Sequence, residues 1–315
     1  MSEQSNAFSD RLTLRPAIPT DTPTLFHLIK SLADYEKLSH EVVGTEEALH
    51  IHLFGDRPII EAILAEWEGE PVGFALVFRN YSLQVAKPGL YLEDLFVLPD
   101  YRSQGIGKAL LSQLKTLVIE RQYHRLDWSV LDWNAPAIAF YQRIGATIDP
   151  DLRINRVMGE SLSHLAQALS ESVIVRPLRS EDVPTLLSWR QSEKNFSATP
   201  EQVEADCLGD NPIAEALVLE AAGQLRGGAF FFLSYSTFLT RPGLVIESLI
   251  CAPDAALEEE LQLIQGVARL AVERGCGRLE WWVAIADQER LAAYQRLGIP
   301  MMDDWRLCQL SVNAD

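Results

Sequence analysis

An arginine and two glycines stand where a β-strand is expected to turn into a helix, in the spacing Arg102-x-x-Gly105-x-Gly107. The mostly apolar segment 90–98 is typical of a strand, and residues 107–121 carry apolar side chains on one helical face. The first N–H groups of a helix have no partner inside it, and together with the helix dipole they can bind a phosphate or a diphosphate. The glycines allow close approach of such a ligand, and Arg102 adds a positive charge. The sequence therefore predicts a phosphate-binding turn.

Two adjacent carboxylates, Glu93 and Asp94, lie in the strand that leads to this turn, and Tyr141 lies in a helix further along. A carboxylate can act as a base and a phenol as an acid. Because neighbouring strand residues face opposite sides of a sheet, we expect only one of the two carboxylates to face a given cleft. Glu93 can equally be a surface carboxylate on a half-exposed strand, and Tyr141 can be a packed aromatic residue.

The elements that position these residues alternate between strands and helices. Residues 59–66 and 72–79 flank the turn Glu68-Gly69-Glu70-Pro71 and are expected to form a hairpin. Further strands are expected at residues 12–16, 90–98, 125–130 and 154–158, and helices at about 21–35, 45–53, 107–121 and 136–144. This order around one phosphate turn indicates an α/β domain that ends with the strand at 154–158. The first residues, up to about Asp10, are expected to form a disordered tail.

After a polar, serine-rich linker with a short helix, the sequence begins again. Residues 173–177 repeat the pattern of residues 12–16, residues 241–254 that of 87–100, residues 279–283 that of 126–130, and residues 293–298 that of 140–145. The phosphate-binding turn is the exception, because the second copy has Ala256-Leu257-Glu258-Glu259-Glu260-Leu261 in its place. Carboxylates repel a diphosphate, and no glycine allows close approach. We expect a degenerate second copy that does not bind the ligand of the first.

The bulk composition is that of a soluble globular protein whose 315 residues suffice for two domains. No apolar run is long enough to cross a bilayer and the opening residues lack the features of a signal peptide, so a cytoplasmic protein is expected. The formal charge of −17 argues against nucleic acids and anionic membranes as partners, and it favours either cationic small molecules or simply solubility. The four cysteines are expected to be buried or reduced thiols, and the spacing of His50 and His52 does not favour a metal site.

The turn and the segment Trp133 to Ala146 together resemble the GCN5-related N-acetyltransferases (GNAT). The acyl-CoA loop of this family has Arg or Gln, two residues, Gly, one residue, and then Gly or Ala, which residues 102–107 match. The resemblance implies an α/β protein with two tandem GNAT domains, each with a mixed, mostly antiparallel central sheet flanked by helices. It places the catalytic domain at residues 1–160, a linker at 161–172 and the degenerate domain at 173–315.

The resemblance also implies acetyl-CoA as the cosubstrate. The residues that would contact it lie at the end of the strand, in the turn and in the second segment. They are Leu95, Phe96, Val97, Arg102, Ser103, Gln104, Gly105, Ile106, Gly107, Lys108, Asn134, Pro136, Ala137, Tyr141 and Arg143. Acetylation of an amine needs a base, because a free aliphatic amine has a pKa near 10, and an acid for the departing thiolate. The family's tyrosine at the place of Tyr141 reaches the CoA sulfur and acts as this acid.

Within the family, the first copy most closely resembles diamine acetyltransferase and its thialysine-acetylating relatives, which carry the segment Tyr-Leu-Glu-Asp found here at residues 91–94. By that resemblance Glu93 binds the substrate amine and relays its proton through water, with Asp94 also at the substrate. Tyr35 and Glu36 resemble a pair that contacts the amine, although they can equally be ordinary helix-end residues.

The resemblance breaks where diamine acetyltransferase has an acid and a Trp before its last strand, since this copy has Pro150 and Leu152 there. Diamine acetyltransferase also has an Asp and a Trp in the hairpin before the strand of Glu93, and this chain has Leu83 and Val85 there. The second copy keeps Asp303 and Trp305 at its version of the former place. We therefore hypothesise an internal pseudo-dimer in which these two residues form a wall of the first cleft. The alternative is a Trp in the core of the second copy.

Three functions are compatible with these patterns. An acetyl-CoA-dependent N-acetyltransferase for a small primary amine, such as a diamine, a polyamine or an amino-acid-like compound, agrees with both Tyr141 and Glu93. Acetylation of a protein N-terminus or lysine would need an open groove. A non-catalytic CoA-binding sensor would need neither residue.

Overall fold

The computed structural model describes residues 11–170 and 173–311, so the expected tail up to Asp10 and two residues of the expected linker lie outside the described residues. The first half contains, in order, β1 (Leu12–Pro16), α2 (Thr22–Glu36), α3 (Glu46–Phe54), β2 (Glu61–Trp67), β3 (Glu70–Ser82), β4 (Lys87–Val97), α4 (Ile106–Glu120), β5 (Arg125–Leu131), α5 (Ala135–Arg143), β6 (Thr147–Asp149), β7 (Leu152–Met158) and α6 (Gly159–Gln167). The strands and helices expected from the sequence are confirmed, with ends that differ by a few residues.

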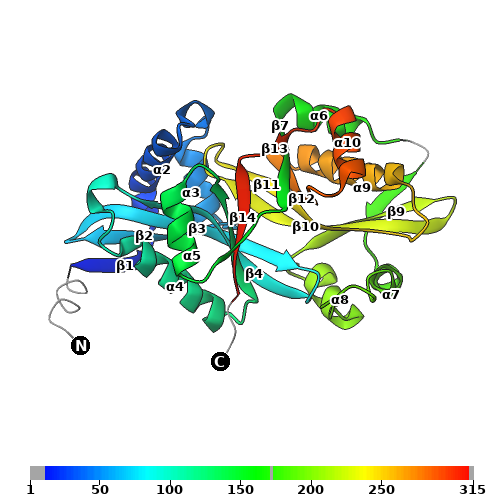
Figure 1. Cartoon of the computed structure of the whole chain (residues 1–315), viewed down its shortest axis with the longest axis horizontal. Coiled ribbons are helices and arrows are strands. Elements are labelled where there is room, and N and C mark those ends of the chain that lie inside the picture. The colour runs from blue at the N-terminus through cyan, green and yellow to red at the C-terminus, as the bar shows by residue number, and fades with distance from the viewer. Residues whose placement is uncertain (1–10, 171–172, 312–315) are drawn as a thin grey trace.

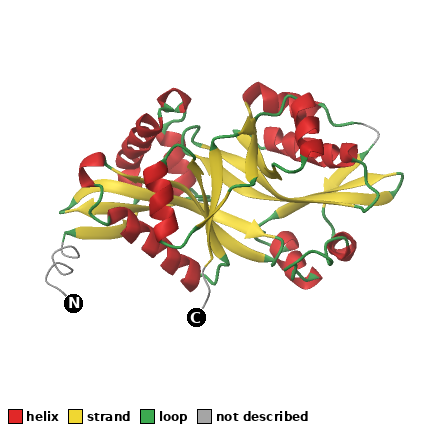
Figure 2. Ribbon diagram, in the orientation of Figure 1, coloured by secondary structure: helices red, strands yellow, loops and turns green. Residues whose placement is uncertain are grey.

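The second half repeats this order, which confirms the internal repeat (Figure 1). It contains β8 (Ile174–Pro177), α7 (Val183–Ser188), α8 (Pro200–Leu208), β9 (Glu215–Ala221), β10 (Gln224–Ser236), β11 (Arg241–Cys251), α9 (Leu257–Glu273), β12 (Arg278–Ala284), α10 (Gln288–Arg296), β13 (Met301–Met302) and β14 (Trp305–Ser311). Figure 2 shows the sheets running through the middle of the molecule with helices on their faces.

Each half is built on a seven-stranded, mostly antiparallel sheet, in agreement with the expected fold class. The first sheet has the order β1-β2-β3-β4-β5-β14-β6 and the second the order β13-β7-β12-β11-β10-β9-β8. In the first sheet only β4 and β5 run parallel, and their pairing is limited to residues 90–92 of β4 and 126–128 of β5. Beyond Leu92 the two strands separate, so the end of β4 keeps a free edge toward β5.

Helix α4 covers one face of the first sheet because Leu110, Leu114 and Val118 recur every four residues and are fully buried. Helix α2 covers the other face with Leu25, Leu28, Ile29 and Leu32. The turn between β4 and α4 follows the end of β4, beyond the residues that pair with β5.

The two halves exchange their last long strand, which corrects the assignment of residues 154–158 to the first sheet. Strand β7 pairs with β12 and β13 of the second sheet, and β14 pairs with β5 and β6 of the first. In Figure 1, β14 (red) accordingly stands beside elements of the first half. Each exchanged strand follows a connection of two residues, Pro150 and Asp151 before β7 and Asp303 and Asp304 before β14. A short connection favours the exchange of strands between two units.

Hairpins of the two halves also reach across reciprocally. The N–H groups of Val43 and Gly44 donate to the carbonyl of Phe238, in the β10–β11 turn, and the N–H of Ser197 donates to the carbonyl of Gln84, in the β3–β4 turn. One hydrophobic core runs through both halves, with Phe78 and Phe232 among its members. The halves therefore form one packed unit.

Within the described residues, no helix is long and apolar enough to cross a membrane. Cys207, Cys276 and Cys308 are buried and Cys251 is half-buried, and all are free thiols, as expected.

Candidate active site

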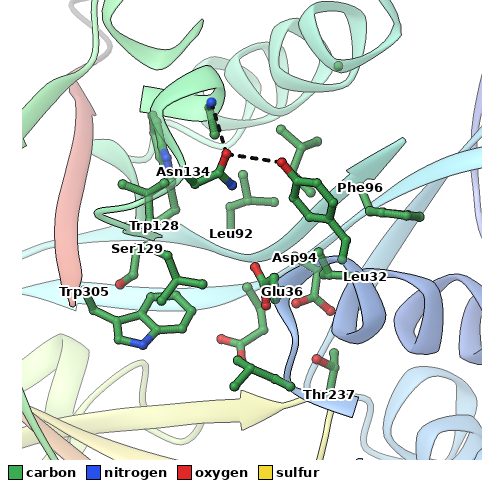
Figure 3. Close-up of a pocket in the computed structure, with 18 of the residues that line it drawn as sticks. Leu32, Glu36, Leu92, Asp94, Phe96, Trp128, Ser129, Asn134, Thr237 and Trp305 are labelled. Atoms are coloured by element: carbon green, nitrogen blue, oxygen red, sulfur yellow. Dashed lines mark hydrogen bonds between the residues drawn. The ribbon is translucent and has the colours of Figure 1, made fainter. Parts of the chain in front are cut away.

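A cavity of about 910 Å³ opens at the place where β4 and β5 separate (Figure 3). Its walls come from α2, β4, the turn before α4, β5 and α5 of the first half, and from the β10–β11 turn, β12 and β14 of the second. Every residue expected to contact the cosubstrate or the amine lines this cavity except Gln104, which is exposed and lies outside its wall. The sequence-derived site is thus brought together in one place.

The predicted phosphate turn has a backbone that presents its N–H groups to the cavity. Gly105 precedes helix α4 with φ of 92°, a left-handed conformation that favours glycine, and Ser103 has φ of 63°. The first N–H groups of α4, from Ile106 to Lys108, have no acceptor within the helix. A Cβ on Gly107 would come within 3.9 Å of Phe140, an ordinary contact, so that glycine is not required by the protein's own packing. Its small size leaves space beside the turn.

Tyr141 lines the cavity from helix α5. The side chain of Asn134 caps this helix by accepting from the N–H of Ala137 at 3.3 Å. The Tyr141 ring packs edge-on against Trp128 with ring centroids 4.9 Å apart. Burial is the main cause that raises the pKa of Tyr141, with a contribution from Cys308 on the exchanged strand β14. The phenol is therefore protonated at neutral pH and can donate a proton.

Tyr35 lies between the phosphate turn and α5. Its hydroxyl donates to Asn134 Oδ1 at 3.3 Å, and the Arg102 guanidinium lies 4.2 Å from the centre of its ring. Arg102 in turn donates through Nε to the carbonyl of Val97 at 2.9 Å. The sequence predicted Tyr35 at the amine, whereas here its contacts are with residues expected to bind the cosubstrate.

Three carboxylates, Glu36, Glu93 and Asp94, line the same part of the cavity, and Figure 3 shows Glu36 and Asp94 directed toward one space. The expectation that only one of Glu93 and Asp94 would face the cleft is wrong. Leu76 pairs with Asp94 and Val77 with Leu92, so Glu93 is the extra residue of a β-bulge. A bulge interrupts the alternation of side chains along a strand, and both carboxylates reach the cavity.

Burial and mutual repulsion make these carboxylates hold protons more tightly than usual. Burial, followed by the charges of Glu93 and Glu41, raises the pKa of Glu36 to about 7. Burial and then Glu93 raise the pKa of Asp94 well above its usual range, while the Thr237 side chain opposes this. Burial also raises the pKa of Glu93, and Arg278 is the strongest opposing charge. A cation in the cavity would relieve this repulsion.

Four charges of alternating sign, each with 7–14% of its side chain exposed, link Glu93 of β4 to β12 and β7 of the second sheet. Arg278 Nη2 donates to both carboxylate oxygens of Glu93 at 3.0 Å, Arg278 Nε lies 3.2 Å from Glu280, and Glu280 accepts from Arg156 Nε. Arg278, Glu280 and Arg156 were not expected from the sequence. The available signal was the repeat itself, because Arg278 stands at the place that Arg125 has in the first copy.

Of the two second-half residues expected to form a wall of the cavity, Trp305 lines it and Asp303 does not. Trp305, on β14, lines the cavity, and the Arg156 guanidinium lies 5.5 Å from the centre of its ring. Asp303 lies outside the wall, with 75% of its side chain exposed and 3.9 Å from Arg153. Asp303 belongs to the β13–β14 turn. Thr237 and Phe238, which the sequence did not suggest, complete this wall.

Comparison with known proteins identifies the family. The acetyltransferase (GNAT) family profile matches residues 29–146. A thialysine N-epsilon-acetyltransferase from Bos taurus is 35% identical over 164 residues, which are 49% of this chain and 96% of that protein. The chain belongs to the GNAT family. An L-ornithine N5-acetyltransferase from Arabidopsis thaliana is 30% identical over 194 residues, 47% of this chain and 85% of that protein. The protein is therefore an acetyltransferase, and its first half is near the thialysine-acetylating members.

Two solved structures show that the GNAT fold extends over the whole chain. A GCN5-related N-acetyltransferase from Sphaerobacter thermophilus superposes with a TM-score of 0.58 at 17% identity, covering 96% of both chains. A tandem GNAT protein from the clavulanic acid biosynthesis pathway gives 0.51 at 15% identity, covering 96% of this chain and 99% of that one. These similarities confirm two tandem GNAT units as the fold.

The GNAT family implies an acyl-CoA cosubstrate, and the first half has the features that would hold one. The turn offers free N–H groups and the positive end of the helix dipole to a diphosphate, with Lys108 beside it. The edge of β4 beyond Leu92, which β5 leaves unpaired, offers backbone groups to amide-containing chains, as in strand addition.

The corresponding turn of the second half is filled by its own side chains. Glu259 accepts from the N–H of Ala256 at 2.9 Å and pairs with Arg226, so the start of helix α9 already has an anion. Glu260 is buried and pairs with Arg290 at 2.7 Å. Tyr294, the counterpart of Tyr141, also donates to Glu260.

Among the described residues, no group of three or more His, Cys, Asp or Glu side chains could hold a metal ion.

Proposed function

We propose that the first half transfers an acetyl group from acetyl-CoA to a primary amine of a small molecule, namely a diamine, a polyamine or an amino-acid-like compound. The observation that carries this proposal is the group of Glu36, Glu93 and Asp94 in a cavity that also contains the phosphate turn. Three carboxylates with raised pKa values attract an ammonium group, because its charge relieves their repulsion. The thialysine and ornithine acetyltransferases that resemble the chain support this acceptor class.

The roles of individual residues follow from their chemistry. Acetyl-CoA supplies an activated acyl group as a thioester. Glu93 binds the ammonium and accepts its proton through water, with Glu36 and Asp94 adding negative charge around the acceptor. The protonated phenol of Tyr141, in the same cavity, donates a proton to the departing thiolate. The cosubstrate is held by the residues from Leu95 to Val97, by Arg102, Ser103 and the residues from Gly105 to Lys108, and by Asn134, Pro136, Ala137 and Arg143.

A small acceptor is favoured over a protein because both halves wall the cavity. Trp305, Thr237 and Phe238 of the second half stand opposite the first-half residues. A lysine on a folded protein needs an open groove for its neighbouring backbone. In this proposal residues 1–160 form the catalytic domain, and residues 173–315, after the linker, form a degenerate copy that pairs with it as an internal pseudo-dimer.

The proposal is tested by release of free CoA thiol from acetyl-CoA across a panel of diamines, polyamines, diamino acids and lysine peptides. We expect turnover with the small amines and none with the peptides. Replacement of Tyr141 by Phe should lower kcat by about 10²–10⁴-fold, the usual contribution of a positioned acid, without weakening acetyl-CoA binding. Tyr294→Phe, the same change in the second half, is the control and should leave kcat unchanged. Tight binding of acetyl-CoA without turnover of any amine would instead indicate a sensor.

A further inference from the structure

Arg278, in the second half, contacts the Glu93 carboxylate of the first half. It is the first residue of β12, and its side chain is only 7% exposed. Its Nη2 atom donates to Oε1 and Oε2 of Glu93 and to the carbonyl of Tyr235. The bond to a fully buried backbone segment fixes the guanidinium, and the guanidinium in turn fixes both oxygens of Glu93.

We propose that Arg278 is a positioning residue for acetyl transfer: it holds the Glu93 carboxylate in place and favours its charged form, so that the second half completes the active site of the first. This inference rests on the proposed function, because it concerns the residue assigned there as the base. It gives the degenerate copy a role in the reaction that does not require it to bind acetyl-CoA.

The surroundings of Glu93 explain why such a partner is needed. The other titratable or charged groups facing Glu93 are Glu36 on α2, Asp94 and Tyr91 on its own strand, Tyr235 on β10, Glu280 on β12 and Arg156 on β7. Of these only Arg156 is a cation, and its Nε atom is bonded to Glu280. A buried carboxylate among other acids takes up a proton unless a cation compensates it, and Arg278 is the cation in contact.

The repeat provides a matched control in the other half. Glu247 stands at the place of Glu93, and it is likewise the extra residue of a bulge, because Phe230 pairs with Ser248 and Phe231 with Ile246. Arg125 stands at the place of Arg278 and is the strongest charge lowering the pKa of Glu247, which burial raises. Arg125 is bonded to Asp127 at 2.7 Å and lies outside the catalytic cavity. Loss of Arg125 thus disturbs an equivalent buried charge without touching the proposed site.

The experiment compares the full-length wild-type protein with Arg278→Gln, Arg278→Lys and Arg125→Gln. The dependence of kcat/KM on pH is measured with acetyl-CoA and the best amine of the panel, and acetyl-CoA binding is measured as a check of the fold. For Arg278→Gln we expect the acid limb of the profile to move to higher pH by about one to two units, because loss of the opposing cation raises the pKa of Glu93. At any pH that lies on the acid limb of both profiles, this lowers kcat/KM by about 10- to 100-fold, one decade for each unit.

The other variants decide between positioning and mere stability. Arg278→Lys keeps a positive charge and should restore part of the shift, and Arg125→Gln should leave the acid limb where it is. An acid limb unmoved in both Arg278 variants, or moved equally by Arg125→Gln, would overturn the inference while leaving the proposed function intact. If Arg278→Gln does not fold, Arg278→Lys alone tests the inference. Lysine holds Glu93 more weakly than arginine does, so the acid limb of the kcat/KM profile must still move to higher pH. No turnover by the wild-type protein would overturn the proposed function itself, and this inference with it.

Discussion

Tyr294 donates a hydrogen bond of 3.1 Å to Glu260, and this pair occupies the second half's version of the acyl-CoA site. The sequence separation that relates Tyr141 to Tyr294 and Arg121 to Arg274 also relates Gly107 to Glu260. Arg121 and Arg274 confirm this correspondence, because each makes a two-pronged ion pair, with Glu61 and Glu215 respectively. The second half therefore places a buried carboxylate where the first has a glycine and free space.

This relationship predicts that a carboxylate introduced at position 107 weakens the binding of acetyl-CoA to the first turn. Gly107→Glu should lower the affinity for acetyl-CoA by at least about 100-fold, because a carboxylate beside the diphosphate repels it and fills its space. Gly107→Ala is the control, since its Cβ meets Phe140 at an ordinary 3.9 Å, and the fold should be retained. Calorimetric titration with acetyl-CoA measures both, and a Gly107→Glu protein that binds like the wild type would contradict the assignment of the turn.

The raised pKa of Glu36 predicts how amine binding depends on pH. Glu36 has a pKa of about 7 in the folded protein, so it is mostly neutral below pH 7 and mostly charged above it. An aliphatic amine stays cationic to a pH of about 10, so its affinity should rise as pH increases through 7. In Glu36→Gln this rise should disappear, with KM for the amine remaining high at pH 8. KM is measured from pH 6 to 9, and an unchanged profile in Glu36→Gln would exclude Glu36 from the amine site.

Arg156 predicts a preference for acceptors that carry a carboxylate. Its Nε atom is bonded to Glu280, whereas its two terminal nitrogens make no hydrogen bond within residues 11–170 and 173–311, and the side chain lines the cavity beside Trp305. Two unbonded terminal nitrogens of a guanidinium can donate a pair of hydrogen bonds to the carboxylate of a diamino acid. Arg156→Ala should raise KM for diamino acids such as ornithine by about 10- to 100-fold, the value of a charged hydrogen bond of about 1.5–3 kcal/mol.

Simple diamines are the internal control for Arg156→Ala, because they lack the carboxylate and still require Glu93. Their KM and kcat should both change little. An equal loss for diamines and diamino acids would show that Arg156 acts through the charge chain rather than on the substrate.

The elements and the composition of the site were predictable from local patterns, whereas the exchange between the halves was not. The turn from Arg102 to Gly107 was predicted from its glycine spacing between a strand and a helix, together with the resemblance of this turn and of residues 133–146 to the GNAT family. Strands β7 and β14 have the same local pattern whichever sheet they join, because side-chain alternation does not specify a partner strand. The bulge at Glu93 was not predicted for a similar reason, because an extra residue in a strand leaves no signal in the composition.

Arg278 shows what the repeat could have added. Its counterpart Arg125 precedes the aligned Leu-Asp-Trp, as Arg278 precedes Leu-Glu-Trp, but a pairing with Glu93 across the halves depends on the exchanged packing. Likewise, the raised pKa of Glu36 arises from burial and from neighbours distant in the sequence. Long-range electrostatics of this kind is a property of the folded site.

The most direct test of the central claim is a crystal structure of the protein with CoA bound. We expect one CoA per chain, with its diphosphate on the N–H groups of the turn from Gly105 to Lys108 and its thiol end between Glu93 and Tyr141. A nucleotide bound at the start of α9 in the second half, or at neither turn, would contradict the account.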